Sequence, residues 1–341
     1  MNRSSQYLNL LIKAIEVNHL NMFTNKRVLV TGATGLIGSS IVDIFVYLNE
    51  GFKQKVELYV AGRSKERVQK RFGESFDNDY FHFIEYDATK GINFDFSVDY
   101  VIQGASNASP TLYKTQPVET LLANVNGVNE ILDYARKVKS QRVIYISSSE
   151  VYGNKGDRTK LIDENDYGFV EGPEPRNSYS AGKRAAENLC VGYASEYGVD
   201  TVIVRPGHIY SSNVLKGDNR ASSDFIGKAN RHEDIEMYSS GKQLRSYTHA
   251  IDCASAIVFL LLNGGDQQAY NISNRDSIVT IRKFAQKVAE TGDVRLLIGD
   301  DDQDMKMSYS ALNASKLESL GWRAVVSLSE GVREAVVNFN E

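Results

Sequence analysis

The stretch that decides the fold is RVLVTGATGLIG, residues 27–38. Its first five residues are mostly apolar or β-branched and predict a buried strand. The periodicity of the apolar residues over 36–48 predicts a helix that follows at once. The glycines between the two runs mark a tight turn. The stretch therefore predicts a strand, a glycine-rich turn and a helix in immediate succession.

The three glycines of this turn have the spacing G-x-x-G-x-x-G. Gly32 lets the chain turn tightly off the strand, Gly35 leaves backbone N–H groups open to a pyrophosphate, and Gly38 lets the helix pack close to the sheet. The helix N-terminus adds unpaired N–H donors and the positive end of its dipole, which favour an anion. Between a strand and a helix, these glycines indicate a dinucleotide-binding turn rather than ordinary turn glycines.

Strands and helices alternate along the first two thirds of the chain. Further strands are predicted at 56–61, 81–87, 98–105, 142–147 and 201–205, and helices at 65–72, 118–137 and 179–196. This alternation is typical of an α/β protein with a parallel sheet covered on both faces. We therefore predict the Rossmann fold, a doubly wound parallel sheet whose ligand lies beyond the carboxyl ends of the strands.

We predict three parts along the 341 residues. Residues 1–24 should form a short N-terminal amphipathic helix, and residues 25–206 the NAD(P)-binding Rossmann domain. Beyond residue 206 the alternation loosens, so 207–341 should be mainly a smaller C-terminal substrate-binding domain with returns to the sheet. The apolar face of the N-terminal helix should consist of Leu8, Leu11, Ile12 and Ile15. The C-terminal part should contain helices near 224–229, 250–262 and 281–290.

Composition excludes several classes of function. The formal net charge of −4 gives no reason to expect a nucleic acid as partner. The two cysteines, Cys190 and Cys253, are too few for a disulfide framework, and the five histidines lack ligand spacing, so we expect no metal site. The N-terminus is unlike a signal peptide, and no apolar run reaches the length of a membrane span. We expect a soluble, cytoplasmic protein without a membrane partner.

The residues at the end of the second strand bear on the choice of cofactor. An acidic side chain there would bind the 2′-hydroxyl of NAD, but the sequence has Ala61, Gly62 and Arg63. An arginine suits the 2′-phosphate of NADP, although it could also stack on adenine or lie in solvent, so both cofactors remain open. Asp87, after the third strand, could accept from the adenine amino group or act as an ordinary turn aspartate.

A tyrosine and a lysine with YxxxK spacing are the first candidate catalytic pair. Tyr179 and Lys183 begin a predicted helix, and four-residue spacing places them on one face. Because an ammonium beside a phenol favours the phenolate, Lys183 should lower the pKa of Tyr179 toward the working pH. The phenolate would take a proton from a sugar hydroxyl while hydride leaves the same carbon. Alone, the pair could equally be a packing tyrosine and a solvated lysine.

Polar residues at the end of the strand 142–147 add weight to this pair. Ser148 offers a hydroxyl that can share the substrate's hydrogen bond with Tyr179. Glu150 adds a carboxylate for a second proton transfer. The glycine turn, the serine and the YxxxK pair follow one another in this order along the chain. The order favours a catalytic site at the carboxyl edge of the sheet over the alternative, in which the polar residues after the strand have no catalytic role.

In this order the motifs resemble the extended short-chain dehydrogenase/reductase family, which contains nucleotide-sugar epimerases, dehydratases and decarboxylases. The resemblance runs from about Lys26 to beyond Asp252. Within the family the chain looks most like UDP-glucuronate decarboxylases and nucleotide-sugar 4,6-dehydratases. The segments with close counterparts there are ASNASP (105–110), SSEVYG (148–153), PRNSYSAGKR (175–184), DNRASSDFI (218–226) and RSYTHAID (245–252).

The resemblance implies a role for each candidate catalytic residue. Ser148 would bind and help to activate the sugar 4-hydroxyl, and Tyr179 would be the base. Lys183 would tune Tyr179 and hold the nicotinamide ribose, and Glu150 would handle protons around C5.

The same resemblance implies two sets of binding residues. Contacts to the cofactor are expected from Gly32, Gly35, Leu36, Ile37, Gly38, Arg63, Asp87, Ala88, Ala105, Tyr179 and Lys183. Contacts to the substrate are expected from Ser109, Ser149, His208, Arg220 and Arg245. The two arginines would hold the nucleotide diphosphate, a task that suits the fixed fork of a guanidinium.

The implied reaction begins with removal of hydride from C4 by a tightly bound NAD or NADP that is recycled. A 4-keto sugar with a C6 carboxylate is a β-keto acid and loses carbon dioxide, whereas one with a C6 hydroxyl loses water, as in the dTDP-glucose 4,6-dehydratase route. Glu150 disfavours a simple 4-epimerase, which needs no extra carboxylate. A reductase that releases its cofactor and a non-catalytic NAD(P)-binding protein are further alternatives. The family also implies a homodimer, formed through the helices 118–137 and 179–196.

Three departures from the family pattern point to a divergent branch with a different nucleotide or sugar. His208 stands where members commonly have asparagine, and it would touch the substrate diphosphate or fill space. Ala61 and Gly62 replace the acidic residue after the second strand, and Ser211-Ser212 replaces the usual Gly-Pro.

Overall fold

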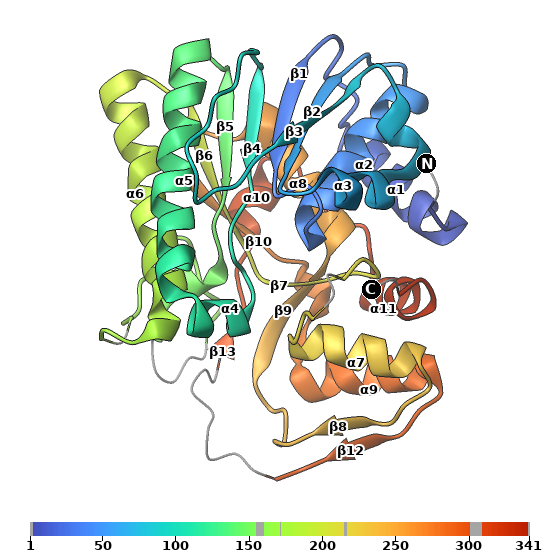
Figure 1. The fold of residues 1–341 in the computed structure, drawn as a ribbon. Coiled ribbons are helices and arrows are strands. Elements are labelled where there is room, and N and C mark those ends of the chain that lie inside the picture. Colours follow the sequence, from blue (N-terminus) through green and yellow to red (C-terminus); the bar gives the residue numbers. More distant parts are fainter. Residues whose placement is uncertain (1–2, 155–159, 171, 215–216, 301–308, 340–341) are drawn as a thin grey trace.

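The computed structural model describes residues 3–154, 160–170, 172–214, 217–300 and 309–339. Its largest element is a seven-stranded sheet in the order β10–β6–β5–β4–β1–β2–β3, parallel throughout (Figure 1). The strands are β1 (Arg27–Thr31), β2 (Glu57–Gly62), β3 (Phe81–Glu85), β4 (Tyr100–Gln103), β5 (Arg142–Ile146), β6 (Thr201–Pro206) and β10 (Gln268–Ile272). The predicted Rossmann fold is confirmed, and the strand order reverses between the neighbours β1 and β4, where such folds bind ligands.

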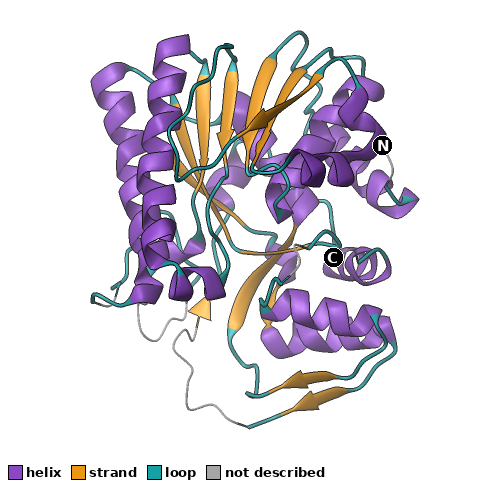
Figure 2. Cartoon of the chain, in the orientation of Figure 1, coloured by secondary structure: helices purple, strands orange, loops and turns teal. Residues whose placement is uncertain are grey.

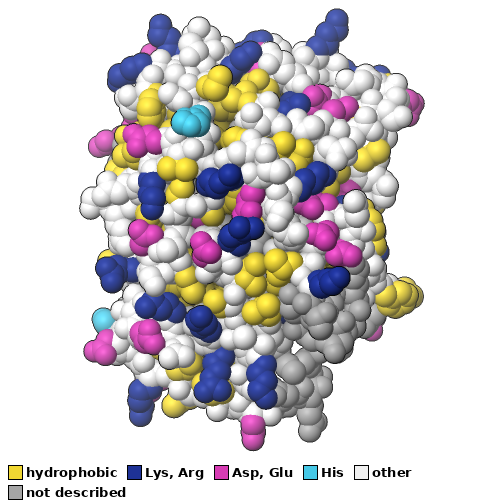
Figure 3. Space-filling view, turned by 180° about the vertical axis from the view of Figure 1, so that it is seen from behind, with side chains coloured by type: hydrophobic (Ala, Val, Ile, Leu, Met, Phe, Trp, Pro, Cys, Tyr) yellow, Lys and Arg dark blue, Asp and Glu magenta, His cyan; other side chains and the backbone are white. Residues whose placement is uncertain are grey.

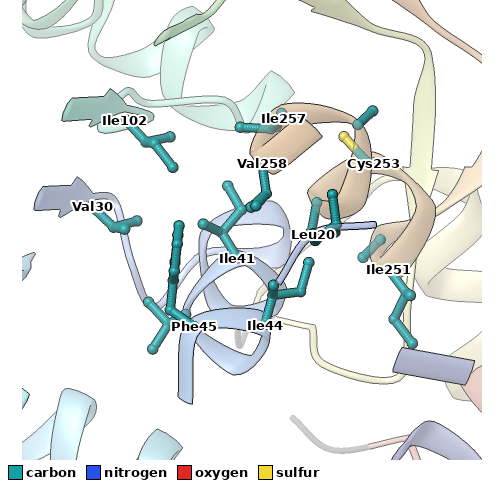
Figure 4. Packing of buried hydrophobic residues seen from close by; sticks show 14 of the residues in the cluster. Leu20, Val30, Ile41, Ile44, Phe45, Ile102, Ile251, Cys253, Ile257 and Val258 are labelled. Carbon is teal, nitrogen blue, oxygen red and sulfur yellow. The ribbon is translucent and has the colours of Figure 1, made fainter. Parts of the chain in front are cut away.

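Helices cover both faces of the sheet. On one face α5 (Pro117–Val138) and α6 (Ser178–Tyr197) lie side by side (Figure 1). On the other face α2 (Leu36–Glu50) packs against α8 (Ala250–Asn263). Figure 4 shows the apolar core there, where Ile41 and Phe45 of α2 approach Val258 of α8 and Val30 of β1. These two layers hold the carboxyl ends of the strands in fixed positions.

The N-terminal helix α1 (Ser5–Val17) exists as predicted, but its buried face differs from the predicted one. Leu11 and Ile15 are fully buried, whereas Leu8 and Ile12 are only half-buried. The buried face also includes Tyr7, Leu10 and Ala14, and the Tyr7 hydroxyl donates to Asp43 on α2 at 2.8 Å. The helix also contacts α8, so it docks on the sheet's α2–α8 layer.

The smaller part of the molecule follows β6 (Figure 2). It contains a sheet in which β9 (Leu244–His249) pairs with β7 (His208–Tyr210), β11 (Ile278–Thr280) and β13 (Tyr309–Ser310). A separate two-stranded sheet consists of β8 (Ile235–Met237) and β12 (Leu296–Ile298). The helices here are α7 (Ala221–Asn230), α9 (Ile281–Gly292) and α11 (Leu328–Val337).

The chain returns to the large sheet within this C-terminal stretch, as predicted. After β9 it forms α8 and then β10, which pairs with β6 at the sheet edge. The short helix α10 (Ser315–Ser319) contacts β10. The division of the chain at residue 206 therefore separates segments that share one core, and as a domain boundary it stays a prediction.

The surface of the described residues carries mixed charge. On the face drawn in Figure 3, Lys and Arg side chains alternate with Asp and Glu side chains. None of the described helices is long and apolar enough to cross a membrane. Within the described ranges no group of three or more His, Cys, Asp or Glu side chains is arranged to hold a metal ion.

Candidate active site

A cavity of about 1430 Å³ runs along the carboxyl edge of the large sheet. Its wall includes residues that directly follow β1, β2, β4, β5 and β6. The volume exceeds the roughly 300–1,000 Å³ that is typical for one small ligand, so there is room for a dinucleotide and a second molecule. All the candidate residues from the sequence line it: Gly32, Gly35, Leu36, Ile37, Gly38, Arg63, Asp87, Ala88, Ala105, Ser109, Ser148, Ser149, Glu150, Tyr179, Lys183, His208, Arg220 and Arg245. The structure thus brings them together, and their individual roles stay predictions.

The glycine-rich turn leaves no room for side chains. Gly32 has φ +66°, and a Cβ there would lie 2.8 Å from the backbone of Gly104. A Cβ on Gly38 would overlap the carbonyl oxygen of Gly32, because the first turn of α2 packs directly on the strand exit. Gly35 caps α2 without a side-chain bond, so the N–H groups at the start of the helix face the cavity. This cradle fits a pyrophosphate.

The adenosine end of the cavity is rich in cationic side chains. Arg63 follows β2, and Arg67 and Lys70 extend from α3 (Lys65–Phe72) along the same wall. Asp87 accepts from the backbone N–H of Thr89 at 3.0 Å and from its hydroxyl at 2.8 Å. The hydrogen bond from the Thr89 backbone, and to a smaller extent that from its hydroxyl, hold the pKa of Asp87 below its usual value. Asp87 therefore acts as a turn aspartate, and its contact with adenine stays a prediction.

Tyr179 lies in the cavity wall with its ring stacked on Tyr113, the centroids 5.0 Å apart. Burial raises the pKa of Tyr179 to about 12, although its hydrogen bond with Ser148 acts in the opposite direction. Lys183 does not donate to the phenol: its Nζ donates to the carbonyl oxygen of Ile146 at 2.7 Å. The predicted lowering of the tyrosine pKa by Lys183 is thus absent here, because desolvation of the phenol dominates.

Lys183 is itself deeply buried, with 3% of its surface exposed. Burial lowers its pKa to about 7, while the negative charge of Glu187 on the same helix raises it. The ammonium lies 4.8 Å from the ring centroid of Tyr145 and 5.7 Å from that of Tyr179. The lysine is therefore poised to gain or lose its proton near neutral pH.

Ser148 and Glu150 come from the turn that ends β5. The 3₁₀ helix η2 (Ser149–Tyr152) begins here, and the hydroxyl of Ser148 accepts from the backbone N–H of Glu150 at 3.2 Å. Burial raises the pKa of the Glu150 carboxyl, and Arg176 and Arg245 act against this. Burial thus favours the protonated form of this carboxyl more than water would, and a proton held beside Ser148 suits a second proton-transfer group.

His208 lines the cavity, and the charges of two arginines act on it. Burial first, then the charges of Arg245 and Arg220, lower the pKa of His208 to about 3, so the ring is neutral. Its Nδ1 is buried and has no hydrogen-bond partner among the residues that the structure describes. Arg220 forms an ion pair with Asp218, and Arg245 donates to the carbonyl oxygen of Leu244 at 2.9 Å. Asp218 thus balances the charge of Arg220, and Arg245 contributes a second guanidinium group to the cavity wall.

Three further residues of the site escaped the sequence analysis. Tyr113, which stacks on Tyr179, and Tyr247 both line the cavity, and Arg176 acts on the pKa of Glu150. Strand periodicity could have predicted Tyr247 as a site residue, because it lies two residues after Arg245 on β9 and its side chain therefore points to the same face. The stacking of Tyr113 depends on the packing of α4 (Pro110–Thr115) against the 3₁₀ helix η3 (Pro175–Asn177) that precedes α6, and this packing has no local sequence signal.

The fold and this site define a dinucleotide-binding enzyme scaffold of the Rossmann class. The model of the NAD dependent epimerase/dehydratase family matches residues 28–273, and the chain belongs to this family. Among curated relatives, UDP-glucuronic acid decarboxylase 1 of Danio rerio is 30% identical, covering 95% of this chain and 75% of the relative. UDP-glucuronic acid decarboxylase 3 of Arabidopsis thaliana is 31% identical, covering 90% of this chain and 87% of the relative.

Solved structures confirm the fold. An epimerase of Methanothermobacter thermautotrophicus superposes with a TM-score of 0.80 at 19% identity, covering 95% of each chain. UDP-glucose 4-epimerase of Thermotoga maritima has a TM-score of 0.75 at 21% identity, covering 92% of this chain and 98% of its own. The dTDP-glucose 4,6-dehydratase of Bacillus anthracis, solved with NAD, has a TM-score of 0.74 at 19% identity, covering 91% and 95%. At these identities the likeness concerns the fold alone.

Proposed function

We propose that this protein is an NAD(P)-dependent lyase that oxidises the sugar of a nucleotide sugar at C4 and then removes carbon dioxide from C6. The observation that carries the proposal is the position of Glu150, a carboxyl with a raised pKa, in one cavity with Ser148 and Tyr179. The sequence relatives are UDP-glucuronic acid decarboxylases, which supports UDP-glucuronate as the substrate. Dehydration at C6 is the second candidate.

The chain's own groups suit the first step. The hydroxyls of Ser148 and Tyr179 are hydrogen-bonded and line the cavity, so a sugar 4-hydroxyl can take the place between them. Tyr179 accepts the hydroxyl proton while the C4 hydride leaves, and the bound dinucleotide supplies the hydride acceptor. This step requires the phenolate form of Tyr179, which burial opposes in the free protein. Bound dinucleotide and substrate would therefore have to supply part of the charge stabilisation, together with a protonated Lys183 nearby.

The second step uses the ketone as an electron sink. Breaking the C5–C6 bond releases carbon dioxide and leaves its electron pair on the enolate of the 4-ketone. Tyr179, which now carries a proton, lies where it can stabilise the enolate oxygen, and Glu150 protonates C5. When hydride returns to C4, Tyr179 would return its proton to the 4-oxygen, so a bound dinucleotide would be recycled without net consumption. Tight binding of a recycled cofactor is part of this proposal.

We assign the substrate diphosphate to the end of the cavity that Arg220 and Arg245 line. Arg220 and Arg245 supply guanidinium groups there, and the neutral His208 offers a further polar atom. Ser109 and Ser149 also line the cavity and would bind the sugar.

We infer that NADP is the preferred cofactor. Arg63, Arg67 and Lys70 line the adenosine end, and β2 ends without the carboxylate that would bind a ribose 2′-hydroxyl. Three cations at this place favour a 2′-phosphate.

A homodimer in the cytoplasm is also part of the proposal. Large apolar side chains are exposed on the outer faces of the two long helices, at Val118, Leu121 and Leu122 of α5 and at Val191 and Tyr197 of α6. A second copy that covers these helices would bury them. Both cysteines are free thiols, as is usual in a reducing compartment.

A substrate panel tests the proposed function. The purified protein is incubated with UDP-, dTDP-, GDP- and CDP-sugars, including UDP-glucuronate, and the products are followed by mass. Loss of carbon dioxide from a uronic acid supports the proposal, and loss of water from a hexose replaces it with the dehydratase. An unchanged mass with a new stereoisomer identifies a 4-epimerase, and net consumption of NAD(P)H identifies a reductase. No turnover in the panel favours a binding protein.

A further inference from the structure

Glu187 lies at the centre of a buried network behind the cavity. Its carboxylate accepts from the hydroxyl of Ser147 at 2.5 Å and from two nitrogens of Arg205, at 2.9 and 2.6 Å. Arg205 also donates to the Tyr152 hydroxyl at 3.1 Å and to the carbonyl oxygen of Glu164 at 2.7 Å. The network therefore joins α6, the end of β5, the end of β6 and η2.

Glu187 reaches the site only through other residues. Neither Glu187 nor Arg205 lines the cavity, whereas Ser147 and Lys183 do. Ser147 directly precedes Ser148, so its bond to Glu187 fixes the point at which β5 leaves the sheet toward the catalytic turn. Lys183 is four residues before Glu187, on the same face of α6, and donates to Ile146 of the same strand end.

We propose that Glu187 is a positioning residue of the active site, with two separable effects: its hydrogen bond to Ser147 places Ser148, and its carboxylate, one helical turn from Lys183 on the same face of α6, acts on the lysine ammonium. This rests on the proposed function for the meaning of Ser148 and Lys183. The charge effect itself is a property of the free protein and is measured without substrate.

The charges around Lys183 make the sign of this effect clear. On α6 the ammonium faces Tyr179, Glu187 and Cys190, and on β5 it faces Tyr145. Burial lowers the pKa of Lys183 to about 7, and Glu187 is the first group that acts against this. Behind Glu187, Arg205 of β6 carries a positive charge, which a neutral residue 187 would leave unbalanced. Loss of the carboxylate must therefore lower the pKa of Lys183 further.

A purely structural ion pair would act differently. Buried pairs that only hold elements together can be replaced by neutral residues of similar volume without a local electrostatic effect. If Glu187 served only to neutralise Arg205, removal of both charges would restore the site. If it acts on Lys183 and Ser148, their properties change even when the fold is retained.

The direct test is an NMR titration of Lys183 in the ligand-free protein carrying ¹³C-lysine, with the resonance assigned from Lys183→Arg. In Glu187→Gln, whose side-chain oxygen can still accept from Ser147, the pKa of Lys183 should fall by about one pH unit or more. In Glu187→Asp, which keeps the negative charge, the pKa of Lys183 should stay close to that of the wild type. An unchanged lysine pKa in a folded Glu187→Gln protein would overturn the charge effect.

Two further variants separate the parts of the proposal. Glu187→Gln leaves Arg205 buried and unpaired, so Glu187→Gln/Arg205→Met provides a form that lacks both charges and retains volume. In this double variant the pKa of Lys183 should still lie below that of the wild type.

Ser147→Ala keeps the carboxylate of Glu187 and should lower kcat about tenfold or more, with the pKa of Lys183 unchanged, because only the placement of Ser148 is lost. Wild-type kcat in Ser147→Ala would contradict the positioning effect.

A matched control is available in a second buried carboxylate. Glu334 on α11 accepts from Ser212 at 2.7 Å and pairs with His249 at 3.0 Å, fully buried and outside the cavity wall. Glu334→Gln should lower stability and leave the Lys183 titration and the pH profile of kcat unchanged. If no substrate is turned over, the proposed function fails while the titration still decides the charge effect. A lysine that responds equally to Glu334→Gln would show that the effect is not local.

Discussion

Tyr179 and Lys183 occupy one face of α6 at a place from which water is largely excluded. Burial raises the pKa of the phenol to about 12 and lowers that of the ammonium to about 7. In the free protein, desolvation therefore opposes the charged form of both groups, and ligands have to supply part of the charge stabilisation. YxxxK spacing predicted that the two residues share a helix face, but it contains no information on how deeply that face is buried.

The burial of Lys183 predicts a gain in stability when its charge is removed. A lysine whose folded pKa lies below its unfolded value binds fewer protons when folded, so stability rises as pH increases from about 7 toward the unfolded value near 10.5. Lys183→Met should raise the free energy of unfolding by about 1–3 kcal/mol at pH 6, with the gain shrinking above pH 7, and abolish turnover. Urea unfolding at several pH values measures this.

The control for that series is Lys283→Met, which replaces an exposed lysine on α9. It should change stability by less than about 0.5 kcal/mol at each pH. A Lys183→Met protein that is less stable than the wild type at pH 6 would show that the ammonium is well solvated or paired, against the description given above.

The glycine cradle makes a second prediction at this scale. Gly38→Ala places a methyl group on the carbonyl oxygen of Gly32 and should cost about 1–3 kcal/mol of stability, together with most of the affinity for the dinucleotide. Gly192 is the matched control, since it is a helical glycine of α6 whose Cβ would meet nothing within 4 Å. Gly192→Ala should stabilise the protein by about 0.5–1 kcal/mol. Thermal unfolding and calorimetric titration with NAD and NADP distinguish the two variants.

At the scale of elements, the buried strands and the long helices were predictable because each has a continuous apolar pattern. The third and fourth strands end earlier than predicted, at Glu85 and Gln103. Beyond them the chain turns into the cavity: Asp87 bonds to Thr89, and the N–H groups of Gly104 and Ala105 donate to the hydroxyl of Thr31 at 3.1 Å. The Asp87 bond is local, but the bonds from Gly104 and Ala105 to Thr31 depend on the neighbouring strand, which local sequence does not describe.

The small sheets of the C-terminal part were beyond prediction for a similar reason. Strand β9 pairs with β7, β11 and β13, which lie on both sides of it in the sequence and are two or three residues long. Their pairing depends on long-range contacts rather than on periodicity. The same holds for the network of Glu187, whose partners come from separate elements.

The cationic side chains at the adenosine end of the cavity, from the end of β2 and from α3, predict the cofactor preference. Arg63→Ala and Lys70→Ala should each weaken NADP binding about tenfold and leave NAD binding nearly unchanged, because only NADP carries the 2′-phosphate. Lys65→Ala is the control, since Lys65 belongs to the same helix but does not line the cavity. Calorimetric titration gives the affinities. Equal losses for both dinucleotides, or a wild-type preference for NAD, would contradict the assignment.

The cavity lies between the large sheet and the smaller C-terminal part. The layer of α5 and α6 contributes Tyr179 and Lys183 to the cavity wall and turns its outer face away from the sheet (Figure 1). An association through this layer would leave the cavity open. Light scattering should give twice the mass of the chain for the wild type and the monomer mass for Leu122→Asp, which puts a charge in the apolar face of α5. Leu320→Asp, at an exposed leucine elsewhere, should remain dimeric.

The central claim is that the site decarboxylates a 4-keto intermediate, and release of labelled carbon dioxide tests it most directly. The protein is supplied with UDP-glucuronate carrying ¹³C at C6 together with NAD or NADP. We expect ¹³CO₂ in amounts equal to the nucleotide pentose formed, no accumulation of reduced dinucleotide, and a rate at least about a hundredfold lower in Tyr179→Phe. Retention of the label in a hexuronic acid product would contradict the account.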